Sequence, residues 1–169
     1  MTLDPLLSAP LAVQIHVFTV APASLIGGWM LMARKGTRLH KMLGRLWLFL
    51  MAVTAVSSFF IHEIRLLGPY SPIHLLSVVT LISCFIVVWS ARTKRLAIHK
   101  RTVQGLYFGA IGLAGLFTLL PGRIMHQVVF GPGAPLSFSW MFGLFGAAVV
   151  AFVIWRSGPR TGQERGSIL

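Results

Sequence analysis

Histidine is the residue type in this chain best suited to chemistry, and the chain contains six histidines. They are His16, His40, His62, His74, His99 and His126. A neutral imidazole is the commonest metal ligand in proteins, and imidazoles also hold haem iron from its axial positions. The histidines therefore indicate a metal or haem centre, provided that the elements carrying them bring them together.

Carboxylates are nearly absent, which removes most other kinds of active site. The chain's only acids are Asp4, Glu63 and Glu164. A pair of carboxylates for general acid–base catalysis is therefore not expected. The sequence also has no H-E-x-x-H helix, no glycine-rich phosphate loop and no plausible Ser-His-Asp set. We expect no hydrolytic or transferase site, and at most a redox protein that transfers electrons.

The composition predicts that these histidines sit on membrane-spanning helices. Hydrophobic residues make up 56% of the 169 residues, charged residues only 11%, and the mean hydropathy is +0.80. A soluble domain carries about a quarter charged residues. Five apolar stretches have about the 20 residues that a spanning helix needs, namely 10–33, 46–62, 73–91, 103–122 and 136–155. We predict an all-α integral membrane bundle that forms one domain, followed by a polar tail at 156–169.

The net charge of +12 is explained by the topology of such a bundle rather than by nucleic acid. Thirteen of the fifteen lysines and arginines lie in 34–45, in 92–101 and in the tail from 156 onward. Only Arg65 and Arg123 lie in the connections on the other side. Short loops rich in lysine and arginine stay in the cytoplasm. The N-terminus is therefore predicted outside and the C-terminus in the cytoplasm.

The spacing of the histidines suggests two duplicated helix hairpins followed by one extra helix. His16 precedes His40 by 24 positions, and His74 precedes His99 by 25. Each hairpin has one histidine near the outer start of its first helix and a His-Lys pair at its cytoplasmic turn. The only cysteine, Cys84, lies inside the third span, so we expect neither a disulfide nor a cysteine metal site.

Small and aromatic residues predict how the helices pack and where the membrane surface lies. The fourth span has a face of small residues that allows another helix to approach closely, formed by Gly105, Gly109, Gly112 and Gly115. Tryptophans fall at the cytoplasmic ends of the spans and are predicted to form an interfacial belt. They are Trp29, Trp47, Trp89 and Trp155.

The preferred hypothesis is b-type haem held between pairs of histidines from facing helices. His16 and His74, one from each hairpin, form a pair near the outer side. His40 and His99 form a second pair near the cytoplasmic side. Two centres at two depths would provide a path for electrons across the membrane. His16 is the strongest candidate, because a polar group inside an apolar helix is costly and usually functional.

Two other hypotheses remain open from the sequence. An outer cluster of His62, Glu63, His74 and His126, with His16 as a further candidate, could hold copper or zinc. Alternatively, the histidines are structural and the protein is a cofactor-free helper subunit or a small transporter. The partners expected are the lipid bilayer, a quinone or a redox protein, and a second copy of the chain in a homo-oligomer.

Several short motifs resemble a known family. They are RLHKMLGRLW, SSFFI, SPIHLLS, GLYFGA and LPGR, in this order. Over most of 14–125 they resemble the bacterial family of predicted membrane proteins catalogued as domain of unknown function 2306. The resemblance implies a multi-pass protein of the bacterial inner membrane and no established activity. It singles out His16, His40, Arg45, His74, His99, Pro121 and Arg123. A looser similarity links the histidine-bearing helices to transmembrane b-type cytochromes.

Overall fold

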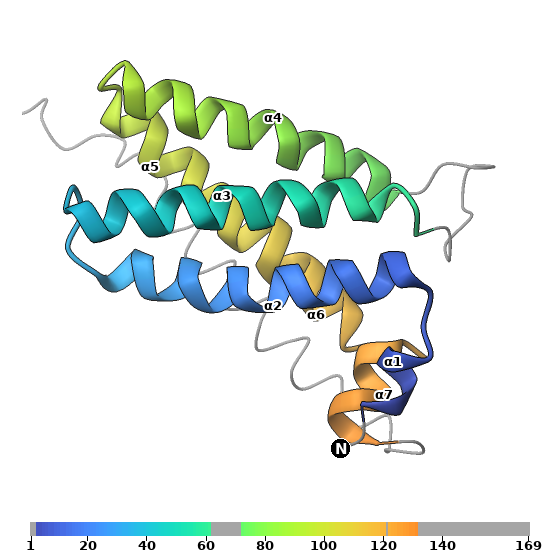
Figure 1. Cartoon of the computed structure of the whole chain (residues 1–169). Coiled ribbons are helices and arrows are strands. Elements are labelled where there is room, and N and C mark those ends of the chain that lie inside the picture. Colours follow the sequence, from blue (N-terminus) through green and yellow to red (C-terminus); the bar gives the residue numbers. More distant parts are fainter. Residues whose placement is uncertain (1–2, 62–71, 121, 132–169) are drawn as a thin grey trace, which may run out of the picture.

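The computed structural model describes residues 3–61, 72–120 and 122–131, and every regular element among them is a helix (Figure 1). In chain order the elements are α1 (Asp4–Leu7), α2 (Leu11–Met32), α3 (Arg38–Ser58), α4 (Pro72–Arg92), α5 (Leu96–Gly105), η1 (Leu106–Leu113), α6 (Ala114–Thr118) and α7 (Ile124–Phe130). The prediction of an all-α membrane bundle is confirmed. The predicted fifth span at 136–155 and the tail at 156–169 lie outside the described residues.

Within the described residues, three helices, α2, α3 and α4, are long and apolar enough to cross a membrane. They lie side by side with α3 in the middle, and they run back and forth between the same two ends (Figure 1). α5, η1 and α6 form one uninterrupted helical run over 96–118 that crosses them. Large apolar side chains on the outer faces are exposed, for example Leu25 (76%) and Phe85 (72%). Such surfaces suit lipid rather than water.

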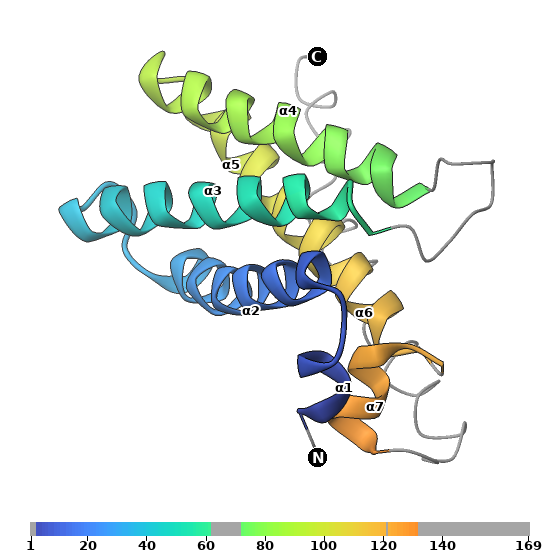
Figure 2. The ribbon, with the colours of Figure 1, turned by 45° about the vertical axis from the view of Figure 1, so that its right-hand side comes forward.

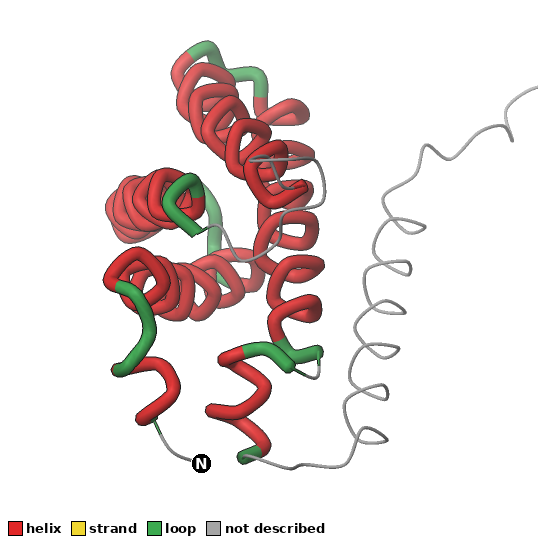
Figure 3. Tube along the Cα trace, turned by 90° about the vertical axis from the view of Figure 1, so that its right-hand side faces the viewer, coloured by secondary structure: helices red, strands yellow, loops and turns green. Residues whose placement is uncertain are grey.

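The four long segments close into a ring around one core (Figure 3). Each packs against the next along the chain, and η1 packs back against α2. Helices that face each other across this ring, which we call the diagonal pairs, are α2 with α4 and α3 with α5, and their backbones stay apart. In the part of the chain that the structure describes, no Cα atom of α2 lies within 8 Å of one of α4, and none of α3 lies within 8 Å of one of α5. Directly packed helices have axes about 8–10 Å apart, so the two diagonals span the core.

Two helices begin earlier than the hydropathy predicts. α3 begins at Arg38 rather than at residue 46, and α5 begins at Leu96 rather than at residue 103. At the start of α3, the Thr37 side chain caps the helix by accepting a hydrogen bond from the backbone N–H of His40 at 3.1 Å. The basic residues before each apolar stretch therefore belong to the helix. As a result, His40 and His99 lie in the first turns of helices and not in loops.

The core of the bundle is built around α3. Trp47 and Met51 are 2% and 1% exposed, and they pack with Ala23, Met30 and Leu106. The prediction that Trp47 belongs to an interfacial belt is therefore wrong, because the amphipathic start of α3 moves this residue two turns deeper than the hydropathy implies. Two other tryptophans of the predicted belt are partly exposed, Trp29 at 46% and Trp89 at 38%. Trp155 lies outside the described residues.

Close helix packing occurs at a different pair of glycines from those predicted. A Cβ atom at Gly27 would lie 2.6 Å from Nε1 of Trp47 and 2.7 Å from a ring carbon of Tyr107. At the adjacent Gly28 it would lie 2.8 Å from the Tyr107 hydroxyl, which donates a hydrogen bond to the Ser24 carbonyl at 3.0 Å. These glycines of α2 receive the large rings of α3 and η1.

Among the described residues, three glycines of the predicted small-residue face make no comparable contact. Added Cβ atoms at Gly105, Gly109 and Gly115 would meet no described atom within 4 Å. The predicted fifth span at 136–155 lies outside the described residues, so the close approach of a helix to this face stays a prediction. The middle of the helical run over 96–118, Leu106–Leu113, is a π-helix. This form is rare and is often found at functional sites.

Two short helices lie below one end of the layer. α1 packs against α7, although the two are far apart in sequence (Figure 2). The Leu6 side chain of α1 is 3% exposed and that of Val128 in α7 is 9% exposed. This small contact is separate from the core around Trp47.

Candidate functional site

Each of the four long helical segments carries one histidine on the stripe of residues that faces the core. In α3, His40 lies seven residues before the buried Trp47, so both lie on the same side of the helix. In the run that starts with α5, His99 lies seven residues before the buried Leu106. The two histidines therefore point toward the inside of the bundle rather than toward lipid.

The histidines of α2 and α4 follow the same rule. His16 lies seven residues before Ala23, which is fully buried. His74 lies three residues before Ser77, which is 4% exposed. Residues spaced by three, four or seven share one face of a helix. The four histidines predicted to bind a cofactor are therefore all core-facing, one on each segment.

His40 and His99 both lie at the end of the bundle where the two basic turns are, each in the first turns of its helix, α3 for His40 and α5 for His99. His99 donates a hydrogen bond from Nδ1 to the backbone carbonyl of Val87 in α4, at 3.1 Å. Since a carbonyl only accepts, the neutral ring carries its proton on Nδ1 and its lone pair on Nε2. Within the described residues, Nε2 of His99 has no hydrogen-bond partner.

His40 holds a buried nitrogen atom to which no described residue forms a hydrogen bond. Its Nδ1 is one of two such side-chain atoms in the described chain, and the other is Nε1 of Trp47. Buried polar atoms are nearly always hydrogen-bonded, so each exception calls for an explanation. A neutral imidazole nitrogen without a partner is able to bind a metal ion. The orphaned atom fits a ligand role for His40.

His16 is held at the opposite end of the bundle by the last turns of α3. Its Nδ1 lies 3.1 Å from the carbonyl oxygen of Thr54, 3.0 Å from Oγ of Ser58 and 3.4 Å from Oγ of Ser57. Both serine hydroxyls donate to the same carbonyl, at 2.9 and 2.8 Å. Because both serine hydroxyls spend their protons on the Thr54 carbonyl, neither can donate to Nδ1 of His16. Nδ1 therefore carries the ring proton and donates it, and the lone pair of the neutral ring lies on Nε2. No described residue bonds that nitrogen.

His74 reaches the same end of α3 from the other side. Its Nε2 lies 3.3 Å from the carbonyl oxygen of Phe59, and its ring lies 5.8 Å from the Phe59 ring, centroid to centroid. His16 on α2 and His74 on α4 are therefore both anchored to the last turns of α3. The structure brings both members of the predicted outer pair to one end of the bundle.

The polar residues that hold His16 were not identified as site residues from the sequence. They are Thr19, Thr54, Ser57 and Ser58, and the hydroxyls of Thr19 and Thr54 are 2.8 Å apart. Their signal was available, since three of them recur in α3 at the spacing of one helix face inside an apolar stretch. Serine and threonine are common in membrane helices because they bond across to neighbouring helices.

The predicted outer metal cluster is only partly described. His126 lies in α7, where it is 5% exposed and its ring centroid is 5.1 Å from that of Phe130. His62 and Glu63 lie outside the described residues. Over 3–61, 72–120 and 122–131, no group of three or more histidines, cysteines or acids is arranged to hold a metal ion.

The chain was compared with known families, curated proteins and solved structures. A family model described as predicted membrane protein (DUF2306) matches residues 13–154. No curated protein matches, and no solved structure matches. The matched range contains the four core-facing histidines, and it covers the four long helical segments apart from the first two residues of α2.

Proposed function

Because the chain belongs to the DUF2306 family of predicted membrane proteins, we propose that it works within the bilayer, as a protein that binds b-type haem between its histidine pairs and transfers electrons. The observation that carries the proposal is the placement of the histidines. One lies on each of four helical segments, each on the core-facing stripe, and two lie at each end of the bundle.

The pairing follows the diagonals of the bundle. His16 and His74 come from α2 and α4, and His40 and His99 come from α3 and α5. In the described chain these are the pairs of long helices that make no close backbone contact. A planar group held between two imidazoles requires helices that are further apart than directly packed ones. The spacing of the diagonals supports such a group.

The orientation of the rings also supports ligand roles. Histidines that bind metals almost always donate the other ring N–H to a carbonyl, a carboxylate or water, which fixes the ring and its tautomer. His16 and His99 both do so through Nδ1, to Thr54 and Val87. His40 adds a buried nitrogen to which no described residue forms a hydrogen bond.

When bound, haem supplies one-electron chemistry whose potential the protein tunes. The chain itself holds the imidazoles in place and keeps water out of the space between the two ends. Trp47, Met51 and Leu106 fill that space with apolar side chains. Along α3, His40 and Thr54 are about 20 Å apart at the usual rise per residue, so the two ends lie at different depths of the bilayer.

The same proposal includes an orientation and partners. The turns at 33–37 and 93–95 lie at one end (Figure 1). Their basic residues support an orientation with that end in the cytoplasm and the N-terminus outside, in a bacterial inner membrane. A quinone within the bilayer or a redox protein at one face would donate or accept the electrons. A homo-oligomer is compatible with this arrangement.

The test is the haem content of the full chain, expressed with haem supplied and purified in mild detergent. A pyridine haemochrome assay should give two haems per chain. His40→Ala should lose one of them, and His126→Ala should lose none, because His126 lies outside the bundle core. A haem-free but folded wild type would contradict the proposal. Metal analysis would then separate a copper or zinc protein from a cofactor-free helper or transporter.

A further inference from the structure

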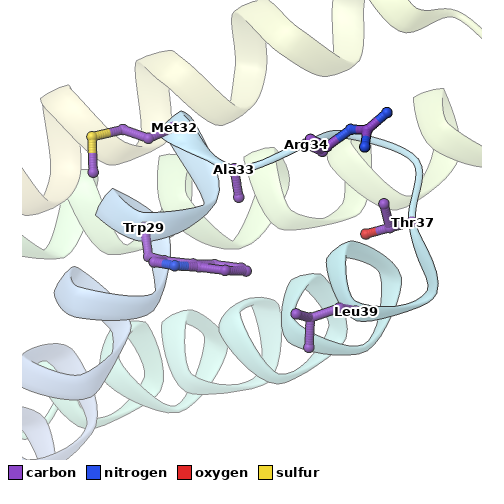
Figure 4. A pocket seen from close by; sticks show the side chains of 6 residues that line it. All are labelled: Trp29, Met32, Ala33, Arg34, Thr37 and Leu39. Atoms are coloured by element: carbon purple, nitrogen blue, oxygen red, sulfur yellow. The ribbon is translucent and has the colours of Figure 1, made fainter.

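The turn between α2 and α3 forms an open pocket at the basic end of the bundle. Its volume is about 540 Å³. It is lined by Trp29, Met32, Ala33, Arg34, Thr37 and Leu39 (Figure 4). None of these residues takes part in the histidine pairs described above.

The lining combines apolar and polar side chains. In Figure 4, Trp29 and Met32 lie on the left, Arg34 and Thr37 lie on the right, and the apolar Leu39 lies below Thr37. Trp29 is 46% exposed and Met32 is 83% exposed, so these apolar groups face the surroundings of the helices. Tryptophan at this depth marks the level of lipid headgroups. The pocket therefore straddles the boundary between the acyl chains and the headgroups.

The polar side chains carry donors suited to a phosphate group. The Arg34 guanidinium makes no hydrogen bond to a described residue, and it has a fork of donors that matches phosphate oxygens. Thr37 accepts from the backbone of His40, so its hydroxyl proton is available to donate. Thr37 also stands at the start of α3, where unpaired backbone N–H groups favour an anion.

The charge around the pocket selects an anion over a zwitterion. The basic residues at this end are Arg34, Lys35, Arg38, Lys41, Arg45, Arg92, Lys94, Arg95, Lys100 and Arg101. In the described part of the chain the one acid is Asp4, which lies in α1 and not in these turns. An uncompensated field of this kind attracts negative headgroups and repels an ammonium group.

We propose that this pocket binds an anionic phospholipid of the surrounding leaflet. Its phosphodiester lies against Arg34 and Thr37, and an acyl chain lies along Trp29, Met32 and Leu39. The site does not depend on haem, because none of its residues belongs to the histidine pairs. It ties the basic end of the bundle to one class of lipid, beyond the general attraction of a positive surface.

Native mass spectrometry of the delipidated full chain tests the proposal. Phosphatidylglycerol and phosphatidylethanolamine with the same acyl chains are added in turn, and bound lipid is counted. We expect the anionic lipid to bind first and tighter. Arg34→Gln should weaken its binding about fivefold, the loss expected for one basic contact. Arg38→Gln is the matched control, since it removes the same charge from the same turn without lining the pocket.

Three results would overturn the proposal. Equal binding of the two lipids would show no selection for charge. Equal losses in Arg34→Gln and Arg38→Gln would reduce the effect to the general field of the basic end. Glycerol 1-phosphate that displaces the lipid fully would identify a site for a free phosphate compound instead. Circular dichroism of each variant confirms that the helices are retained.

Discussion

The Nδ1 of His40 is one of two buried side-chain atoms that have no hydrogen-bond partner among the described residues, and the other belongs to Trp47. Leaving a buried polar atom unpaired costs about 1–3 kcal/mol, and an apolar residue would avoid that cost. His99 at the same end of the bundle has its Nδ1 bonded to Val87 and its other nitrogen unbonded by any described residue. At the scale of single residues, each imidazole therefore has a nitrogen that no described residue bonds, and the proposal assigns these nitrogens to a ligand.

A substitution separates the structural and ligand roles of His99. In His99→Gln the amide is able to donate to the Val87 carbonyl, but it offers no imidazole to iron. We expect the melting temperature to stay close to that of the wild type while the haem content falls by half. Differential scanning fluorimetry in detergent and the pyridine haemochrome assay measure the two quantities. A large loss of stability with unchanged haem per folded chain would assign His99 a structural role only.

His16 is expected to contribute measurably to stability even without a cofactor. In His16→Ala, the hydrogen bonds to Thr54 and Ser58 are lost, although the serine hydroxyls keep their own bond to the Thr54 carbonyl. Hydrogen bonds between membrane helices average about 0.6 kcal/mol each, so the loss should be about 1 kcal/mol. Reversible unfolding in SDS measures it. His16→Gln should recover part of the loss, and identical stabilities of all three proteins would contradict the hydrogen-bond network.

At the scale of elements, α2 packs most closely against its neighbouring helices at Gly27, which has the shortest distance from an added Cβ atom among the described glycines. Gly27→Ala adds a Cβ atom 2.6 Å from Nε1 of the fully buried Trp47. Overpacking of this kind costs about 1–3 kcal/mol. The matched control is Gly105→Ala, where the added atom meets no described atom within 4 Å and helix propensity favours alanine. The free energy of unfolding in SDS should fall for the first variant only; equal effects would mean that α2 does not pack closely here.

At the scale of elements, hydropathy predicted the apolar centres of the helices better than their ends. The first turns of α3 and α5 contain arginine, lysine and histidine, which lower the local hydropathy although they are helical. The side chain of Thr37 caps the first turn of α3, and this cap fixes where the helix begins. The π-helix at Leu106–Leu113 has no signal in periodicity or composition, since it depends on how the run crosses α2 and α4.

For the whole molecule, the sequence predicted the direction in which successive helices run, and the structure accordingly has His16 and His74 toward one end of the bundle and His40 and His99 toward the other. That these pairs hold a cofactor stays a prediction. The hydroxyl residues around His16 were missed because serine and threonine are also common in ordinary membrane helices. The tight contact at Gly27 and Gly28 was missed because it depends on the large rings of Trp47 and Tyr107, which lie far away in sequence.

The orientation of the whole molecule has its own test. In a Cys84→Ser background, Ser8→Cys and Thr93→Cys place one exposed thiol at each end of the bundle. A maleimide that does not cross membranes, added to spheroplasts, should label the Ser8→Cys protein at once. The Thr93→Cys protein should be labelled only after lysis, because basic turns stay in the cytoplasm. The reverse pattern would invert the proposed orientation.

The most direct measurement of the central claim is a reduced-minus-oxidised visible spectrum of the full chain, expressed with haem supplied and purified in mild detergent. Two imidazoles on one iron make a six-coordinate b-type centre. The account predicts a sharp alpha band that disappears when all four core-facing histidines are replaced. A chain that is folded by circular dichroism but colourless would contradict it, and the histidines would then be structural or would bind another metal.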